Sequence, residues 1–237
     1  MEGEAHIEEG ALVVNGKKSL ARSAPLIKDL SVKSLEAWVQ LETLDQAGGA
    51  AISVQTRDGG VFDAIVFAER VPREWMAGSD GFRRTQNFDG PREEEADKTP
   101  THLVLVYGSN GSITGYRNGQ LYGKGYQSSG PNTFKSNQAE IVFGLRHGDA
   151  SDGKLLKGRI LEARLYDRAL TQEEVMAIAA KDANFVSEQQ MIGALSENEK
   201  GLWDQWVRDR SSREQHLKQL EAIAPKSGKD EVWADLA

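Results

Sequence analysis

The stretch from Gly158 to Val175, GRILEARLYDRALTQEEV, constrains the fold of this chain more than any other. Its first half alternates apolar side chains with Glu162 and Arg164, which is typical of a β-strand with one buried face. After a short turn, Thr171 and Glu174 have the spacing of a helix capping box. The stretch therefore predicts a closing strand of an all-β domain, followed by a tight corner and a short helix packed beneath the strand's edge.

This stretch resembles the closing signature of the laminin-G-like, concanavalin A-like lectin/glucanase superfamily. Two earlier segments match that family in the same order. Ser34 to Leu41, SLEAWVQL, is similar to its early Trp-bearing strand, and His102 to Tyr107 followed by GYRNG at residues 115–119 resembles a later pair of strands. Thr101 stands where many members have Trp. The resemblance covers residues 10–180, and three ordered motifs are more specific than any one of them.

The resemblance implies a concanavalin A-like jelly-roll β-sandwich of two antiparallel sheets over residues 1–180. The segment Phe62 to Gln86 is similar to sandwiches found in large multidomain proteins of planctomycete-type bacteria. We therefore expect an extracellular or periplasmic location, with neighbouring domains of a longer protein as partners. The acidic start, MEGEAHIEEG, has no apolar core and so shows no signal peptide. We expect the export signal to lie upstream.

Composition excludes several classes of protein. There is no cysteine, which rules out disulfides, thiolate metal sites and a cysteine nucleophile. The net charge of −7 comes without a basic surplus in either part of the chain, so we predict no nucleic-acid binding. No run approaches the roughly 20 apolar residues of a membrane span.

Turn signals predict a sandwich of short strands. Asp58-Gly59-Gly60, Asn110-Gly111 and Asn118-Gly119 each predict a hairpin. Residues 102–107 are apolar almost throughout and predict a central strand covered on both faces. Trp38 lies opposite the apolar stripe of its strand. It is either a core residue of a strand covered on both faces or an aromatic on an open sheet, where a sugar ring can stack.

Residues 69–100 show no sustained period, yet they contain Trp75, Phe82 and Phe88. Loops of this length in compact domains are usually functional or disordered, and the aromatics favour order. We expect an elaborated loop over one rim of the sandwich, with a short strand near residues 83–85. We expect the Glu93-Glu94-Glu95 run to be a solvated tip.

Residues 181–237 are predicted to form a helical C-terminal extension. Ser196 and Glu199 have capping-box spacing, and apolar residues recur over a helix of about 25 residues. One alternative is a helical linker whose apolar stripe lies on the sandwich or on a neighbouring domain. The other is a dimerising helix.

The rim loop supplies the candidate ligand-binding residues. Carbohydrate recognition uses aromatic faces and planar polar groups. The alternative for the adjacent arginines is an ion pair with Asp80 or Asp89. The candidates are Trp75, Phe82, Arg83, Arg84, Gln86 and Asn87, joined by Tyr116 and Arg117 from a neighbouring strand. We expect replacement of Trp75 and Arg84 by Ala to abolish binding and leave the fold intact.

Calcium is the cation that the resemblance implies, since laminin-G-like domains often carry Ca²⁺ on oxygen ligands. The candidate ligands are Asp80, Asp89, Asp149 and Asp152. No EF-hand pattern is present. The alternative is that each aspartate caps a turn.

Catalysis finds no support in the sequence. Glucanases that resemble this family place paired acids on one strand in an E-x-D-x-E pattern, which is absent here. The four histidines are scattered, and no G-x-S-x-G elbow occurs. We predict a non-catalytic module that binds polysaccharide or glycoprotein. The alternatives are a spacer or protein-interaction domain and, disfavoured by the missing acids, a glycoside hydrolase.

Overall fold

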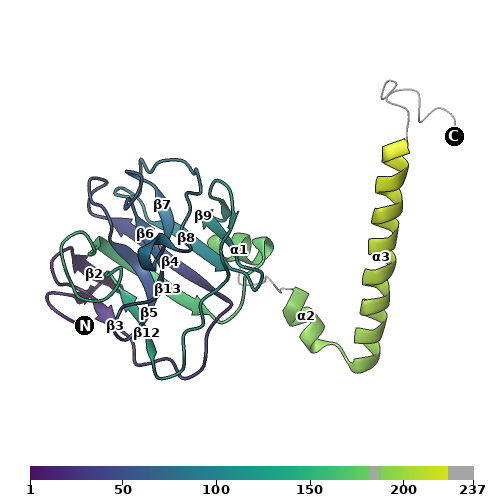
Figure 1. The fold of residues 1–237 in the computed structure, drawn as a ribbon, viewed down its shortest axis with the longest axis horizontal. Helices are drawn as coiled ribbons and strands as arrows, with labels where there is room; N and C mark the ends of the chain where they lie inside the picture. Colours follow the sequence, from purple (N-terminus) through teal and green to yellow (C-terminus); the bar gives the residue numbers. More distant parts are fainter. Residues whose placement is uncertain (182–185, 187, 224–237) are drawn as a thin grey trace. The chain divides into compact units, whose positions relative to one another are not determined.

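The computed structural model describes residues 1–181, 186 and 188–223. The chain divides into two compact units, Met1–Phe185 and Val186–Ala237. The first is built mainly of strands and the second of helices (Figure 1). We keep residues 1–180 as the proposed sandwich domain and residues 181–237 as the proposed extension.

The larger sheet has eight antiparallel strands among the described residues. Their spatial order is β1-β2-β13-β4-β8-β9-β10, and β11 pairs with β9. The strands are β1 (His6–Glu8), β2 (Ala11–Asn15), β4 (Lys33–Leu41), β8 (Thr101–Tyr107), β9 (Ser112–Arg117), β10 (Gln120–Leu121), β11 (Tyr126–Gln127) and β13 (Lys157–Tyr166).

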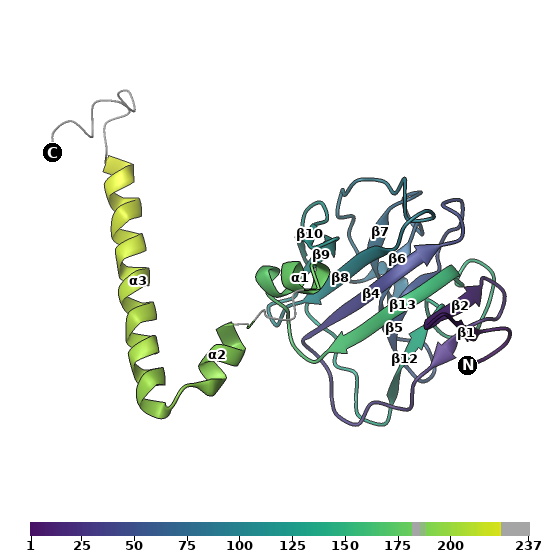
Figure 2. The ribbon, with the colours of Figure 1, turned by 180° about the vertical axis from the view of Figure 1, so that it is seen from behind.

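The smaller sheet has five antiparallel strands in the order β3-β12-β5-β6-β7, again counting described residues. They are β3 (Ala21–Arg22), β5 (Ala50–Thr56), β6 (Phe62–Phe67), β7 (Trp75–Ser79) and β12 (Ala139–Phe143). Figures 1 and 2 show the two sheets as stacked layers, seen from opposite sides. The predicted jelly-roll sandwich is confirmed, as are the three predicted hairpins, which join β5 to β6, β8 to β9 and β9 to β10.

Alternation along the central strands builds the core between the sheets. Leu35, Ala37 and Val39 of β4 point inward, where they join Ile65 and Phe67 of β6 in one apolar cluster. The expectation that residues 102–107 are covered on both faces is confirmed, because every residue of β8 is buried. This strand therefore has an apolar sequence without alternation.

The closing strand β13 lies between β2 and β4. Gly158 pairs with Val14 on one side and with Leu41 on the other. A Cβ at Gly158 would lie 2.3 Å from the carbonyl oxygen of Gln40, and the residue has φ of 154°. The strand can therefore join the sheet only with glycine at this position.

Helix α1 (Gln172–Ala179) follows β13 and begins with the predicted capping box, formed by Thr171 and Glu174. It packs on the outer face of the large sheet, where Val175 contacts the side chains of Val104 and Tyr116. Figure 2 shows α1 lying beside β8 and β9. The helix thus covers one end of this face.

A buried ion pair joins the two sheets. Lys33 of β4 has no exposed surface, and its Nζ lies 2.8 Å from Oδ2 of Asp63 on β6. The ammonium also lies 4.5 Å from the ring centroid of Tyr107 and 5.1 Å from that of Phe134. Burial lowers the pKa of Lys33, and the charge of Asp63 opposes that shift. Both charged side chains are fully buried, so each depends on the other for compensation.

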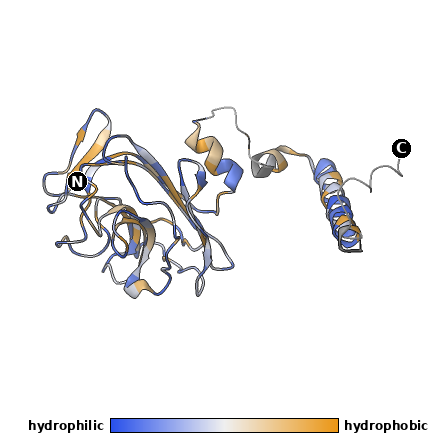
Figure 3. Ribbon diagram, turned by 90° about the horizontal axis from the view of Figure 1, so that it is seen from above, coloured by the Kyte–Doolittle hydropathy of each residue, from blue (hydrophilic) through white to orange (hydrophobic). Residues whose placement is uncertain are grey.

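The helical unit contains α2 (Glu188–Ala194) and α3 (Glu197–Ile223). Ser196 and Glu199 form the predicted cap of α3, and the long helix is confirmed. Figure 3 shows α3 as mostly hydrophilic, with hydrophobic positions interspersed along it. None of the helices within the described ranges has the length and apolar character needed to cross a membrane.

Replacing Asp63 by Asn should destabilise the sandwich by about 3–5 kcal/mol, because Lys33 would keep a buried charge without its partner. Urea unfolding followed by the circular dichroism of the β-sheet measures this. The control is Asp167→Asn, which breaks an exposed pair with Lys28 and should cost about 0–1 kcal/mol. Equal stability of both variants would contradict the prediction that the Lys33–Asp63 pair stabilises the sandwich.

Candidate functional site

A tight corner follows β7 at one end of the small sheet. It is a single 3₁₀ turn, η1 (Asp80–Phe82), in which Gly81 has φ of 54° and Phe82 has φ of 55°. Glycine adopts this left-handed conformation readily, whereas a bulky side chain such as Phe is strained in it. The ring of Phe82 is nevertheless 44% exposed. A strained aromatic held at the surface is an observation from which function can be inferred.

Arg84 anchors this corner from below. Its side chain is only 5% exposed, and its Nη2 donates to Asp63 Oδ1 at 3.0 Å, to Asp80 Oδ1 at 2.8 Å and to the carbonyl oxygen of Phe62 at 3.0 Å. Its backbone N–H donates to Ser79 Oγ. Burial alone would lower the pKa of Arg84, but the two carboxylates raise it. The guanidinium is therefore engaged inside the protein and holds the turn in place.

Five side chains form the surface above the anchor, and we call them the rim patch: Arg70, Phe82, Arg83, Gln86 and Asn87. The guanidinium carbon of Arg70 lies 5.5 Å from the ring centroid of Phe82. Gln86 Nε2 donates to the carbonyl oxygen of Gln127, and Asn87 is exposed. Arg70 and Asn87 line the same small cavity of about 10 Å³. Arg70 was not predicted, because no periodicity in residues 69–100 indicates which way its side chain points.

Trp75 does not belong to the rim patch. It is 3% exposed, its ring centroid lies 4.8 Å from that of Phe67, and its Nε1 donates to Glu93 Oε1 at 2.7 Å. The same carboxylate accepts two hydrogen bonds from Arg117. The expectation of a solvated Glu93 is therefore wrong. This glutamate is buried, and its carboxylate accepts hydrogen bonds from the indole of Trp75 and the guanidinium of Arg117.

Tyr116 and Arg117 also lie apart from the rim patch. As neighbours on β9 they point to opposite faces of the sheet. Tyr116 is buried beneath α1, and burial raises its pKa. The short strand expected near residues 83–85 is instead β7, which ends before the corner. Of the eight predicted contact residues, Phe82, Arg83, Gln86 and Asn87 reach the surface together, and Arg84 supports them.

The profile of the family described as "Concanavalin A-like lectin/glucanases superfamily" matches residues 15–176. The chain belongs to this superfamily. No curated protein matches the chain.

Two solved structures resemble this concanavalin A-like chain. Domain 4 of AbnA, a GH43 extracellular arabinanase from Geobacillus stearothermophilus in complex with arabinotriose, is 24% identical with a TM-score of 0.53, and the match covers 75% of this chain and 82% of that one. Trypanosoma rangeli sialidase in complex with 2,3-difluorosialic acid is 16% identical with a TM-score of 0.54, over 76% of this chain and 29% of that one. At these identities the likeness shows the fold alone.

The four aspartates proposed as calcium ligands do not fit a calcium site of this superfamily member. Asp80 is bonded to Arg84, whereas Asp89, Asp149 and Asp152 are exposed. Within the ranges that the structure describes, no three His, Cys, Asp or Glu side chains lie together in a way that could hold a metal ion. A Ca²⁺ ion needs six to eight oxygen ligands, and these carboxylates do not converge to supply them.

A second cluster lies on the outer face of the large sheet of this concanavalin A-like domain. The carboxylate of Glu36, which is fully buried, lies 3.3 Å from His102 Nε2 and accepts hydrogen bonds from Arg164 at 3.0 Å and from Tyr166 at 2.6 Å. Burial alone would raise the pKa of Glu36, but the hydrogen bonds of His102 and Tyr166 and the charge of Arg164 hold it below the usual value. Glu36 lies two residues before Trp38 and therefore on the same face of β4, but alternation along a strand does not indicate its partners.

Trp38 covers part of this cluster. Its ring centroid lies 4.7 Å from that of His102, and Lys181 Nζ lies 5.0 Å from the centroid of the Trp38 ring. The side chain is half-buried. Trp38 is thus neither a core residue between the sheets nor an open platform, because other side chains of the protein occupy its surroundings.

Replacing Trp75 by Ala should cost about 3–5 kcal/mol of folding stability, since it removes a large core side chain and leaves Glu93 without one donor. This corrects the expectation that the fold tolerates that change. Urea unfolding measures it. The matched control, Phe82→Ala, should stay within roughly 0.5 kcal/mol of wild type. Equal losses in the two variants would refute the assignment of one to the core and the other to the surface.

Glu36 should make the sandwich acid-sensitive. Since its pKa is lowered in the folded state, it stabilises the fold above the unfolded-state pKa and loses that contribution as pH falls through the folded-state pKa. Urea midpoints should therefore fall more steeply with acidification below about pH 5 in wild type than in Glu36→Gln. The exposed control Glu42→Gln should keep the wild-type pH profile. Identical profiles for wild type and Glu36→Gln would contradict this prediction.

Proposed function

We propose that this chain is a non-catalytic carbohydrate-binding module of an exported multidomain protein, and that the rim patch is its binding surface. The observation that carries the proposal is the exposed side chain of Phe82 on a backbone held at positive φ. Aromatic rings pack on the apolar faces of sugar rings, and the planar side chains of Arg83, Gln86 and Asn87 can bond hydroxyl groups. The buried Arg84 holds these groups in position before a ligand arrives.

The known proteins of similar fold support this proposal. The arabinanase domain, matched over 82% of its length, was solved in complex with arabinotriose. The sialidase is matched over 29% of its length and its ligand is a covalent intermediate, so it contributes only the likeness of fold. Both belong to enzymes that act on sugars, in which a domain of this fold accompanies other parts of the chain. The export of this protein rests on the family resemblance and on these neighbours.

Two observations support a non-catalytic role. Glycoside hydrolysis needs two carboxyl groups on either side of an accessible bond. The carboxylates of Glu36 and Glu162 both form ion pairs with Arg164, and Glu36 is buried. The carboxylates near the rim patch, Asp63 and Asp80, bind Arg84 in the same way.

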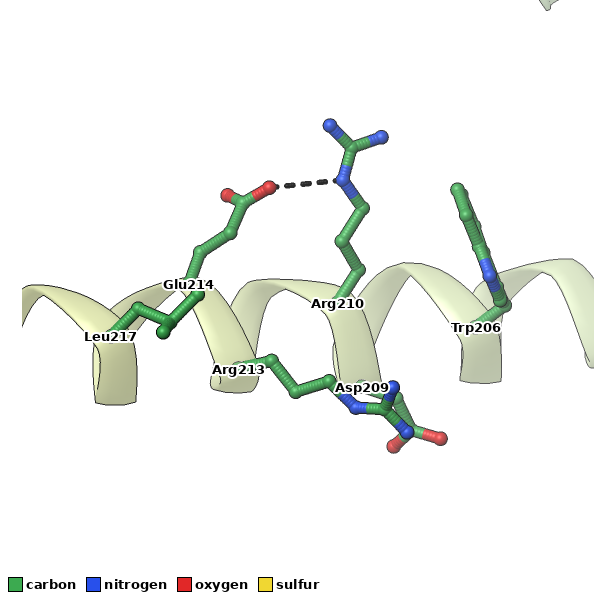
Figure 4. Close-up of a pocket in the computed structure, with 6 residues that line it drawn as sticks. All are labelled: Trp206, Asp209, Arg210, Arg213, Glu214 and Leu217. Atoms are coloured by element: carbon green, nitrogen blue, oxygen red, sulfur yellow. Dashed lines mark hydrogen bonds and ion pairs between the residues drawn. The ribbon is translucent and has the colours of Figure 1, made fainter. Parts of the chain in front are cut away.

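The second candidate function is a protein-interaction or spacer domain, favoured by the surface of α3. The apolar side chains exposed along this helix are Leu202, Trp206, Val207, Leu217 and Leu220. Figure 4 shows Trp206 and Leu217 on either side of a charged stretch, where Arg210 donates to Glu214. Exposed apolar residues in such numbers on one helix are typical of interaction surfaces.

Phe82→Ala should weaken polysaccharide binding roughly tenfold, because the lost ring contact is worth about 1.5 kcal/mol. Affinity gel electrophoresis against a panel of arabinan, hydroxyethylcellulose and polygalacturonate measures this with the full chain. The control Ile27→Ala removes an apolar side chain that is even more open to solvent elsewhere on the sandwich and should bind as wild type does. Absence of retardation by every polysaccharide would favour the spacer.

A further inference from the structure

The charges beneath the rim patch are balanced. Lys33 and Arg84 are the two cations of the buried network, and Asp63 and Asp80 are its two anions. Asp63 lies between both cations, while Asp80 pairs with Arg84 at 2.8 Å. Asp63 and Asp80 are thus paired with buried cations.

The charges on the rim patch are not balanced. The side chain of Arg83 is 79% exposed, and its Nη1 lies 3.9 Å from Asp80 Oδ2, a weak contact with a carboxylate that Arg84 already holds. Arg70 forms no ion pair with any residue in the described part of the chain. Glu74 lines the same small cavity as Arg70 but does not pair with it. Arg70 thus lies against the Phe82 ring, and Arg83 is the next residue in the chain. Arg83 shares Asp80 with Arg84. Glu69, whose carboxylate the charge of Arg70 influences, is bound by Arg146.

This positive surface stands out because the chain as a whole carries a net charge of −7. A local charge opposite to that of the whole protein does not serve solubility, which the net charge already provides. The fork of donors on Arg matches a carboxylate in two parallel hydrogen bonds. Hydroxyl groups alone would be recognised equally well by neutral amides such as those of Gln86 and Asn87.

We propose that the rim patch selects polysaccharides that carry carboxylates, such as polyuronates. Phe82 packs on the apolar face of a sugar ring, and Arg83 and Arg70 bind carboxylates of the same or neighbouring rings. This inference rests on the proposed function and names the ligand class for the same site. Phe82 provides binding that is common to sugars, whereas the two arginines provide the preference for charge.

The test compares polygalacturonate with its carboxyl-reduced form, in which every carboxylate has become a neutral hydroxymethyl group. The full chain should bind polygalacturonate at least tenfold more tightly in isothermal titration calorimetry. Arg83→Gln and Arg70→Gln should each remove most of that preference, and Phe82→Ala should weaken binding of both polymers. Arg159→Gln, on β13 beside β2 and paired with Glu8, removes one positive charge from another part of the sandwich and should leave the preference unchanged.

Each other result overturns the inference. Equal binding of the two polymers, or binding of neutral polysaccharides only, would refute the carboxylate preference and leave the sugar-binding function standing. A loss in Arg159→Gln as large as that in Arg83→Gln would show general charge attraction in place of a site. Binding to no polysaccharide at all would refute the sugar-binding function together with the inference.

Discussion

The structure of the sandwich depends on a carboxylate buried between its two sheets. Asp63 of β6 meets Lys33 of β4 on one side and Arg84 of the rim corner on the other. A lone charge in this environment would be costly, so the three side chains form one unit. Apolar packing between alternating residues would permit many small displacements of one sheet over the other. The charged unit requires β4, β6 and the corner to lie in one fixed arrangement.

The same unit determines what the corner presents to solvent. Because Arg84 is fixed by Asp63, Asp80 and a backbone carbonyl, the turn before it adopts two successive left-handed residues. The positive φ of Phe82 is therefore maintained by the contacts that Arg84 makes two residues later in the chain. Buried Arg84 thus lies within two residues of the exposed Arg83 and Gln86.

Local patterns in the sequence predicted most of the fold. Alternation along residues 34–41, glycine-containing turns and the capping box of Thr171 each depend on neighbouring residues, and each is confirmed. The rim loop was predicted less well, because its side-chain directions depend on partners distant in the sequence. Trp75 and Glu93 bind each other across the loop, and nothing in a run of three glutamates indicates which one is buried. The sequence identified Arg83 and Arg84 as candidate ligand-binding residues. It did not indicate that Arg83 lies at the surface and that Arg84 is buried.

Neighbouring residues of the corner contribute very differently to the stability of the fold. Arg84 is tied to the interior, and a change there disturbs the folding of both sheets. Arg83 and Gln86 have few interior contacts, so related chains can vary them at little thermodynamic cost. The outward-facing side chains of this corner can therefore be exchanged while the scaffold below them stays constant.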